Sequence, residues 1–198
     1  MNNLVNSIKI MSESFFDEIK IYRRHLHQHP ELSFKEYQTA DFIENKLREM
    51  GIENIQRIAK TGITFLLEGS SEGKNIALRA DIDALPIFEK SQVDYRSKYD
   101  GIMHACGHDV HTSCLLGVAK ILNQLKSEFK GSVKFIFQPG EEKAPGGASL
   151  LIKEGILQNP IPKTILGQHV MPLIEVGKVG FRSGKYMACL LYTSPSPR

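Results

Sequence analysis

Residues 109–137 read DVHTSCLLGVAKILNQLKSEFKGSVKFIF, and this stretch predicts a helix followed by a strand. In the first part, Asp109–Leu125, apolar positions occur nearly all round a helix, so we expect this helix to be buried between layers. The apolar run Val133–Phe137 predicts a strand. A buried helix followed by a strand is typical of a layered α/β structure.

Two amphipathic helices are predicted upstream of this stretch. Apolar residues recur at three- and four-residue steps over residues 4–22, and Pro30 should stop the first helix. The segment Ser33–Glu36 is typical of a capping box, in which the serine accepts from a backbone N–H and the glutamate reaches back. A second helix should follow and end at Gly51. Its apolar face comprises Tyr37, Ala40, Ile43 and Leu47.

Short runs with strand character occur between glycine-containing turns and along the C-terminal part of the chain. They predict strands at Ile55–Ala59, Ile63–Glu68, Ile76–Ala80, Ile165–Gln168 and Val176–Arg182, with a short helix at Gly147–Lys153. Strands that alternate with helices predict the α/β class, with a mixed, largely parallel sheet sandwiched by helices.

The composition is that of an ordinary globular protein. Among 198 residues, 25 are Lys or Arg and 22 are Asp or Glu, so the net charge is +3 and argues against nucleic-acid or membrane partners. Three cysteines without a CxxC pair argue against a disulfide scaffold and for a reducing compartment. The sequence has neither a long apolar run nor the apolar core of a signal peptide, so we expect a cytoplasmic protein.

Three His, one Cys and one Asp occur within eight residues, from His104 to His111. Thiolate and imidazole are good ligands for Zn²⁺ and similar ions, and Cys106 and His108 lie two residues apart, so both side chains can reach one metal centre. Asp109 comes near the start of the predicted helix, where a carboxylate can orient an imidazole. The plainer interpretation is a helix N-terminus with incidental histidines and a buried thiol.

Further polar residues follow the predicted strands. Asp81 and Asp83 come after one strand, Glu141 and Glu142 after a second, and His169 after a third. Each alone could be a solvated turn, an exposed acidic loop or a structural histidine. In a parallel sheet, however, these strand ends converge on one edge. One carboxylate could then hold a cation while the other activates water, which indicates a hydrolytic metal centre rather than a structural one.

Five motifs occur in the order seen in M20 metallopeptidases. They are His25–Ser33, Arg79–Pro86, His104–Asp109, Gln138–Glu142 and Gly167–Val170. More narrowly, the chain resembles the amidohydrolase branch, which contains N-acyl-amino-acid amidohydrolases, hippurate hydrolases, auxin-conjugate (IAA-amino acid) hydrolases and N-acetyldiaminopimelate deacetylases. The resemblance covers about Ile19 to Ala188.

This resemblance implies a zinc-peptidase-like catalytic domain with two divalent metal ions of the zinc, manganese or cobalt type. Glu141 would be the general base for a metal-activated water, and Asp81, Asp83 and Asp109 would support the site from behind the ligands. The implied substrate is a small N-acyl amino acid, cleaved at a linear amide bond rather than at a peptide bond. The implied metal ligands are Cys106, which could bridge both ions, with His108, Glu142 and His169.

The resemblance also sets expectations for domain organisation. Family members carry a lid or dimerisation domain soon after the position of Arg182–Gly184, a further ligand His beyond it, and a substrate-contacting His within it; these are absent from this sequence. We therefore expect residues 1–188 to be the N-terminal part of a catalytic domain, and residues 189–198 to be a foreign or disordered Ser/Pro tail. The full-length form should be a homo-oligomer through its lid, and whether the chain as given is active stays open.

Two other functions compete with the amidohydrolase. Four protein ligands can close one tetrahedral site, so the chain could be a non-catalytic metal-binding fragment. It could also be a dipeptidase or aminopeptidase of the same superfamily, although the Cys106-Gly107-His108 motif stands where peptidase branches tend to carry an Asp. The acyl group, the amino acid and the identity of the metal are not encoded in these motifs.

Overall fold

The computed structural model describes residues 2–181 and 183–184. Five strands form one sheet in the order β1-β2-β4-β3-β5. β3 lies between β4 and β5 and pairs with both in parallel, whereas β1 pairs with β2 and β2 with β4 in antiparallel orientation. The strands are β1 (Gln56–Ile58), β2 (Gly62–Glu68), β3 (Asn75–Asp81), β4 (Ser132–Gln138) and β5 (Ile165–Gly167).

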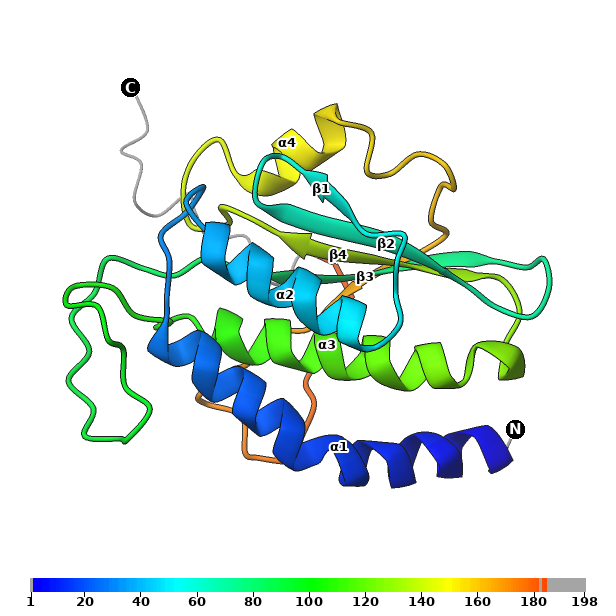
Figure 1. Ribbon diagram of the computed structural model, residues 1–198, viewed down its shortest axis with the longest axis horizontal. Coiled ribbons are helices and arrows are strands. Elements are labelled where there is room, and N and C mark those ends of the chain that lie inside the picture. Colours follow the sequence, from blue (N-terminus) through cyan, green and yellow to red (C-terminus); the bar gives the residue numbers. More distant parts are fainter. Residues whose placement is uncertain (1, 182, 185–198) are drawn as a thin grey trace.

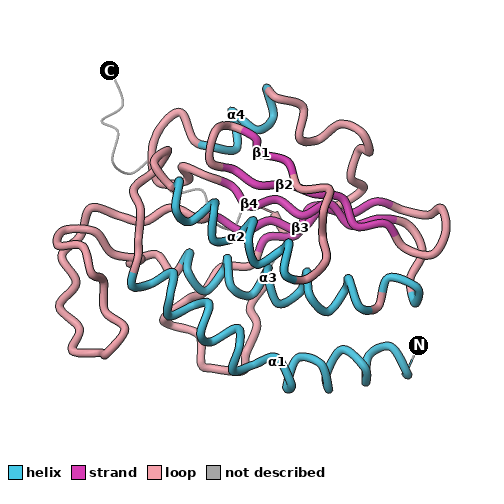
Figure 2. The backbone as a smooth tube through the Cα atoms, viewed as in Figure 1, coloured by secondary structure: helices cyan, strands magenta, loops and turns pink. Residues whose placement is uncertain are grey.

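Helices cover both faces of this sheet (Figures 1 and 2). α2 and α3 pack on one face, α1 packs on the outer side of α3, and α4 packs on the opposite face. The helices are α1 (Asn2–Gln28), α2 (Tyr37–Glu49), α3 (His108–Gln124) and α4 (Gly147–Lys153), with a short 3₁₀ turn at Lys126–Glu128. The predicted α/β class, with a mixed sheet between helices, is confirmed.

The alternation of side chains along β4 divides the core into two parts. Phe135 and Phe137 are fully buried under α2 and α3, where the Phe135 ring stacks on that of Phe65 with centroids 4.5 Å apart. Ile136 points to the other face and packs with Leu151 of α4. β4 is therefore covered on both sides, which fixes the position of the loop that follows it.

The three-layer packing explains the composition of α3. This helix lies between α1 and the sheet, as its apolar positions predicted, and Leu115, Leu116 and Ala119 are buried. α1 forms the outer layer (Figure 1), and it buries Tyr22, Leu26 and His27 near its C-terminal end. Among the residues that the structure describes, no helix combines the length and the apolar character needed to span a membrane.

Two local predictions are wrong. Residues 176–181 form no strand, and Arg182, the last residue of that predicted element, lies outside the described residues, as does the predicted tail at 189–198. The first residue of α2, Tyr37, is 54% exposed rather than part of the apolar face.

The predicted capping box is wrong as well. α2 begins after Glu36 without a side-chain cap hydrogen bond. The Ser33 hydroxyl donates instead to Asp83, and the buried Glu36 carboxylate accepts from the Thr61 hydroxyl and from the backbone N–H of Gly140. Glu36 also accepts from the nearby Phe34 N–H, but the other hydrogen bonds of Ser33 and Glu36 go to residues that are distant in the sequence, and they tie this segment to the loops at the carboxyl ends of β3 and β4.

Candidate metal centre

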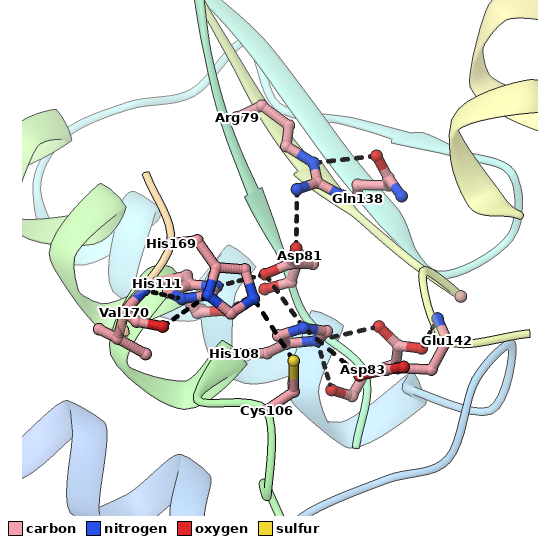
Figure 3. Close-up of polar contacts among 12 residues, drawn as sticks. Arg79, Asp81, Asp83, Cys106, His108, His111, Gln138, Glu142, His169 and Val170 are labelled. Atoms are coloured by element: carbon pink, nitrogen blue, oxygen red, sulfur yellow. Dashed lines mark hydrogen bonds and ion pairs between the residues drawn. The ribbon is translucent and has the colours of Figure 1, made fainter. Parts of the chain in front are cut away.

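Polar side chains from several segments meet at one edge of the sheet (Figure 3). Because β3, β4 and β5 are parallel, their carboxyl ends lie at this edge, next to the N-terminus of α3. Asp81 ends β3, and Asp83 follows it. Glu142 comes from the loop after β4, and His169 from the segment after β5. The sheet thus brings together the strand ends that the sequence predicted to converge.

Cys106 and His169 face each other across this edge. The Cys106 Sγ lies 3.4 Å from His169 Nε2, and the thiol side chain is half-buried. The other ring nitrogen, Nδ1, lies 2.7 Å from the carbonyl oxygen of Val170. A carbonyl only accepts, so Nδ1 carries the proton and donates it, and Nε2 keeps its lone pair toward the sulfur.

Asp83 holds two parts of the site at once. His108 Nδ1 lies 2.9 Å from the Asp83 carbonyl oxygen and 3.3 Å from its Oδ1. Oδ2 accepts from the backbone N–H of Glu142 at 3.0 Å and from the Ser33 hydroxyl at 2.6 Å. Burial acts to raise the pKa of Asp83, but the hydrogen bonds from His108 and Ser33 outweigh burial and lower it. The carboxylate is therefore ionised and sets the orientation of the His108 ring.

Two buried atoms at the centre lack a hydrogen-bond partner among the described residues, and they lie close together. They are His108 Nε2 and Glu142 Oε1, 3.8 Å apart. Leaving such groups buried and unpaired costs free energy. Burial lowers the pKa of His108, but the hydrogen bond to Asp83, the nearby Cys106 side chain and the charges of Asp81 and Asp83 raise it to about 11. The site therefore attracts one positive charge, which a proton or a metal cation can supply.

The donor set fits a divalent metal. Three groups of side chains each bring their ligand atoms within 4.8 Å of one another, and His108 belongs to all three. The groups are Cys106 with His108 and His169, Asp81 with His108 and His111, and His108 with Glu141 and Glu142. Thiolate, imidazole and carboxylate together suit zinc, manganese or cobalt ions. Thus the structure gathers the predicted ligands Cys106, His108, Glu142 and His169.

Glu141, the predicted base, lies at the exposed rim of this cluster. Burial, together with the negative charges of Glu142 and Asp81, raises the pKa of Glu141. A carboxylate whose pKa is shifted toward neutrality is a stronger base than an ordinary surface glutamate.

Among the described residues, the Asp109 carboxylate makes no hydrogen bond to the side chain of a predicted ligand. Its Oδ2 lies 2.7 Å from His27 Nδ1 and 2.9 Å from Arg23 Nε, and His27 Nε2 lies 3.1 Å from Glu89 Oε1. The imidazole that Asp109 holds is therefore that of His27, and the expected contact with a ligand His is not made. This buried network joins α1 to the start of α3 and to the loop after β3.

Sequence reasoning missed His111. Its Nδ1 lies 2.6 Å from Asp81 Oδ1, and its Nε2 accepts from the backbone N–H of Val170 at 2.9 Å. The signal was present, because His111 follows His108 by three residues and this spacing puts two side chains on one face of a helix.

A family model described as "Peptidase family M20/M25/M40" matches residues 77–190 of the chain. The chain is 41% identical over 181 residues to an N-acyl-L-amino acid amidohydrolase of Geobacillus stearothermophilus, with 91% of the chain and 48% of that protein covered. It is 49% identical over 168 residues to an N-acetyl-L-cysteine deacetylase of Bacillus subtilis, with 85% of the chain and 40% of that protein covered. The chain thus spans about half the length, or less, of these curated relatives.

A solved structure supports the same grouping. The YXEP protein of Bacillus subtilis, described as a dinuclear metal-binding peptidase from the M20 family, superposes with a TM-score of 0.82 at 45% sequence identity. The superposition covers 87% of this chain and 48% of that one.

Proposed function

Because the chain belongs to peptidase family M20/M25/M40, we propose that it forms the metal-binding part of an amidohydrolase that acts on N-acyl amino acids. The family expected from the five sequence motifs is thereby confirmed. One observation carries the proposal: His108 Nε2 and Glu142 Oε1 are buried, unpaired and 3.8 Å apart, beside Cys106 and His169. A cation placed among these donors satisfies all of them.

We assign Cys106, His108, Glu142 and His169 as ligands of two divalent ions. A dinuclear relative at 45% identity supports the number of ions, and the donor types suit zinc, manganese or cobalt. Such ions, when bound, polarise an amide carbonyl and make water acidic enough to react near neutral pH.

The protein groups have separate roles in this proposal. Asp83 orients His108 and holds the backbone of Glu142, so two ligands keep their positions before any cation arrives. Glu141 takes a proton from the attacking water and later delivers it to the leaving amine, as its raised pKa favours. The water attacks the amide carbon, the carbon–nitrogen bond breaks, and a carboxylic acid and an amino acid are released.

The substrate class is proposed from the relatives. Their names share an amide between an acyl group and an amino acid, and a linear amide of this kind is the bond we assign. Because the relatives are about twice as long, we propose that residues 1–188 contribute the first part of a catalytic domain. The matching whole enzyme would supply the remaining groups and the contacts for a homo-oligomer. The free thiol at Cys106 favours a reducing compartment, so we place the enzyme in the cytoplasm.

The test is a metal titration followed by a substrate panel. The chain should bind divalent metal, as measured by calorimetry with Zn²⁺, Mn²⁺ and Co²⁺, and His108→Ala should weaken binding strongly. Joined to the remaining half of a relative, the chain should hydrolyse N-acetyl amino acids but not free dipeptides. Glu141→Gln should lower kcat by about 10²- to 10⁴-fold with metal content unchanged. Glu72→Gln, in the exposed turn between β2 and β3, is the matched control.

Different outcomes separate the alternatives. Cleavage of dipeptides instead of acylated amino acids would favour a peptidase. Tight binding of one ion without hydrolysis, in the joined protein as well, would favour a non-catalytic metal-binding protein.

A further inference from the structure

His111 lies inside the cluster of ligand atoms, yet both of its ring nitrogens are already engaged. Nδ1 lies 2.6 Å from Asp81 Oδ1, and Nε2 accepts the Val170 N–H at 2.9 Å. An N–H can only donate, so Nε2 is the unprotonated nitrogen and Nδ1 carries the hydrogen given to the carboxylate. Neither nitrogen has a lone pair left for a metal. In the group formed by Asp81, His108 and His111, the imidazole of His111 therefore has no nitrogen to offer to a metal.

Asp81, which accepts the hydrogen bond from His111, is itself held in place by other hydrogen bonds. Asp81 is the last residue of β3 and is buried; its Oδ2 accepts from Arg79 at 2.7 Å, and its carbonyl oxygen accepts from the Thr112 hydroxyl at 2.9 Å. Asp81 is thus fixed to the central strand and to α3 before it meets His111. A group held in this way can position another.

The segment that carries His169 needs such an anchor. β5 is a three-residue edge strand that ends at Gly167, and all three of its residues are exposed. Beyond it, Val170 packs against the start of α3, where a Cβ built on Gly107 would lie only 2.3 Å from Val170 Cγ2. The His111 ring lies edge-on to that of His169, with ring centroids 4.5 Å apart, and both side chains belong to the cluster drawn in Figure 3.

We propose that His111 is a positioning residue, which ties the backbone of Val170 to Asp81 and so sets His169 beside Cys106. A series of hydrogen bonds connects β3 to the proposed ligand His169. His111 donates to Asp81 at the end of β3 and accepts from the Val170 N–H, and the Val170 carbonyl accepts from His169 Nδ1. The role in metal binding rests on the function proposed above, whereas the anchoring of Val170 does not.

Two polar substitutions of His111 test its hydrogen bonds to Asp81 and to Val170 separately. In His111→Gln the amide oxygen can reach the place of Nε2 and accept from Val170, while in His111→Asn the shorter amide can bond Asp81 but stops short of Val170. The first readout is hydrogen exchange of the Val170 amide in the metal-free chain, followed by nuclear magnetic resonance. Protection should persist in wild type and His111→Gln and be lost in His111→Asn.

The second readout is the binding of Co²⁺, whose absorption spectrum reports a bond to a thiolate. His111→Asn should bind Co²⁺ about 10- to 100-fold more weakly than wild type, with an altered thiolate band, and His111→Gln should restore both. His25→Gln, an exposed histidine on α1 outside the cluster, is the control and should leave both readouts unchanged.

The two readouts can each contradict the proposed role of His111. Equal protection of the Val170 amide in all three proteins would overturn it, and so would equal Co²⁺ affinity and spectra. Circular dichroism identifies a variant that is unfolded, and the comparison is then made between wild type and the folded variant. A wild type that binds no Co²⁺ would refute the proposed function, while loss of Val170 protection in His111→Asn alone would still support the anchoring role.

Discussion

Asp83 accepts a hydrogen bond from the backbone N–H of Glu142 at 3.0 Å, across 59 residues of sequence. This bond joins the loop after β3 to the loop after β4, because the two parallel strands end side by side. The same carboxylate also holds the ring of His108. The relative position of two proposed ligands therefore depends on one side chain that itself binds no ion.

We predict that Asp83→Asn lowers metal affinity about 10- to 100-fold. The neutral amide is a weaker acceptor for His108, and its NH₂ group cannot accept from Glu142 or Ser33. Titration calorimetry with Zn²⁺ measures the effect. Ser33→Ala, which removes one hydrogen bond and leaves the carboxylate, should cost much less. An Asp83→Asn protein with the affinity of wild type would show that the ligands hold their positions without it.

The Glu36 side chain is hydrogen-bonded to the loop after β4, which carries Glu142. This fully buried carboxylate accepts from Gly140 N–H at 2.8 Å, from Phe34 N–H at 2.8 Å and from the Thr61 hydroxyl at 2.6 Å. Glu36→Ala leaves these donors buried and unpaired, so the free energy of unfolding should fall by about 3 kcal/mol or more. Glu36→Gln keeps one oxygen acceptor and should lose much less. Urea denaturation compares the two, and equal losses would argue against a role for these bonds.

The stability of the protein should depend on the protonation of His27. Burial lowers the pKa of this imidazole, but the hydrogen bond and charge of Asp109 and the hydrogen bond to Glu89 outweigh burial and raise it. The folded state therefore binds the proton more tightly than the unfolded state, whose pKa is about 6.5. This contribution is fully present below that value and is lost as the pH rises through the folded pKa.

The corresponding measurement compares wild type with His27→Gln. The difference in the free energy of unfolding between the two proteins should shrink as the pH is raised from about 6 toward 9. His25→Gln, on the exposed side of α1, removes an imidazole whose pKa is lowered by burial and which is therefore neutral in both states above about pH 7, so its stability difference from wild type should stay constant between about pH 7 and 9. A constant difference between wild type and His27→Gln would mean that folding leaves the pKa of His27 unchanged, and a difference that grows with pH would mean that folding lowers it.

Gly107 has no room for a side chain. It adopts φ +85°, in the left-handed region, and a Cβ there would overlap Val170 Cγ2 at 2.3 Å. Gly107→Ala should therefore destabilise the fold by about 1–3 kcal/mol and displace the segment that carries His169. Thermal unfolding measures the first effect and Co²⁺ affinity the second. The double variant Gly107→Ala, Val170→Ala should recover part of both losses, and no recovery would place the strain elsewhere.

The sequence predicted where the proposed ligands lie because each of them adjoins a regular element. Cys106 and His108 come directly before an apolar helix, while Glu142 and His169 each follow a strand, so recognising the elements was enough to expect their convergence. Sequence periodicity also predicted the elements themselves. Regularly spaced apolar residues indicated α1 and α3, and short apolar runs indicated β2, β3 and β4.

The failures share a different cause. Ser33 and Glu36 have the right spacing for a local cap, but Ser33 donates to Asp83, 50 residues away, and Glu36 accepts from Gly140, 104 residues away, as well as from the nearby Phe34. Asp109 contacts His27 at a separation of 82 residues. A local pattern shows which groups can form hydrogen bonds, but the tertiary fold selects the partner, and the free energy of satisfying a buried group outweighs that of a surface cap.

His108 occurs in all three groups of ligand atoms, yet Asp83 occupies its Nδ1, which leaves a single nitrogen to offer. One lone pair cannot serve two ions. The two metal positions of the proposed centre would therefore differ in their ligands: His108 can bind the ion at one position, and the ion at the other position would be bound by the other side chains of the cluster. For the proposed centre we therefore expect two positions of different affinity, which a metal titration would resolve as two unequal binding steps.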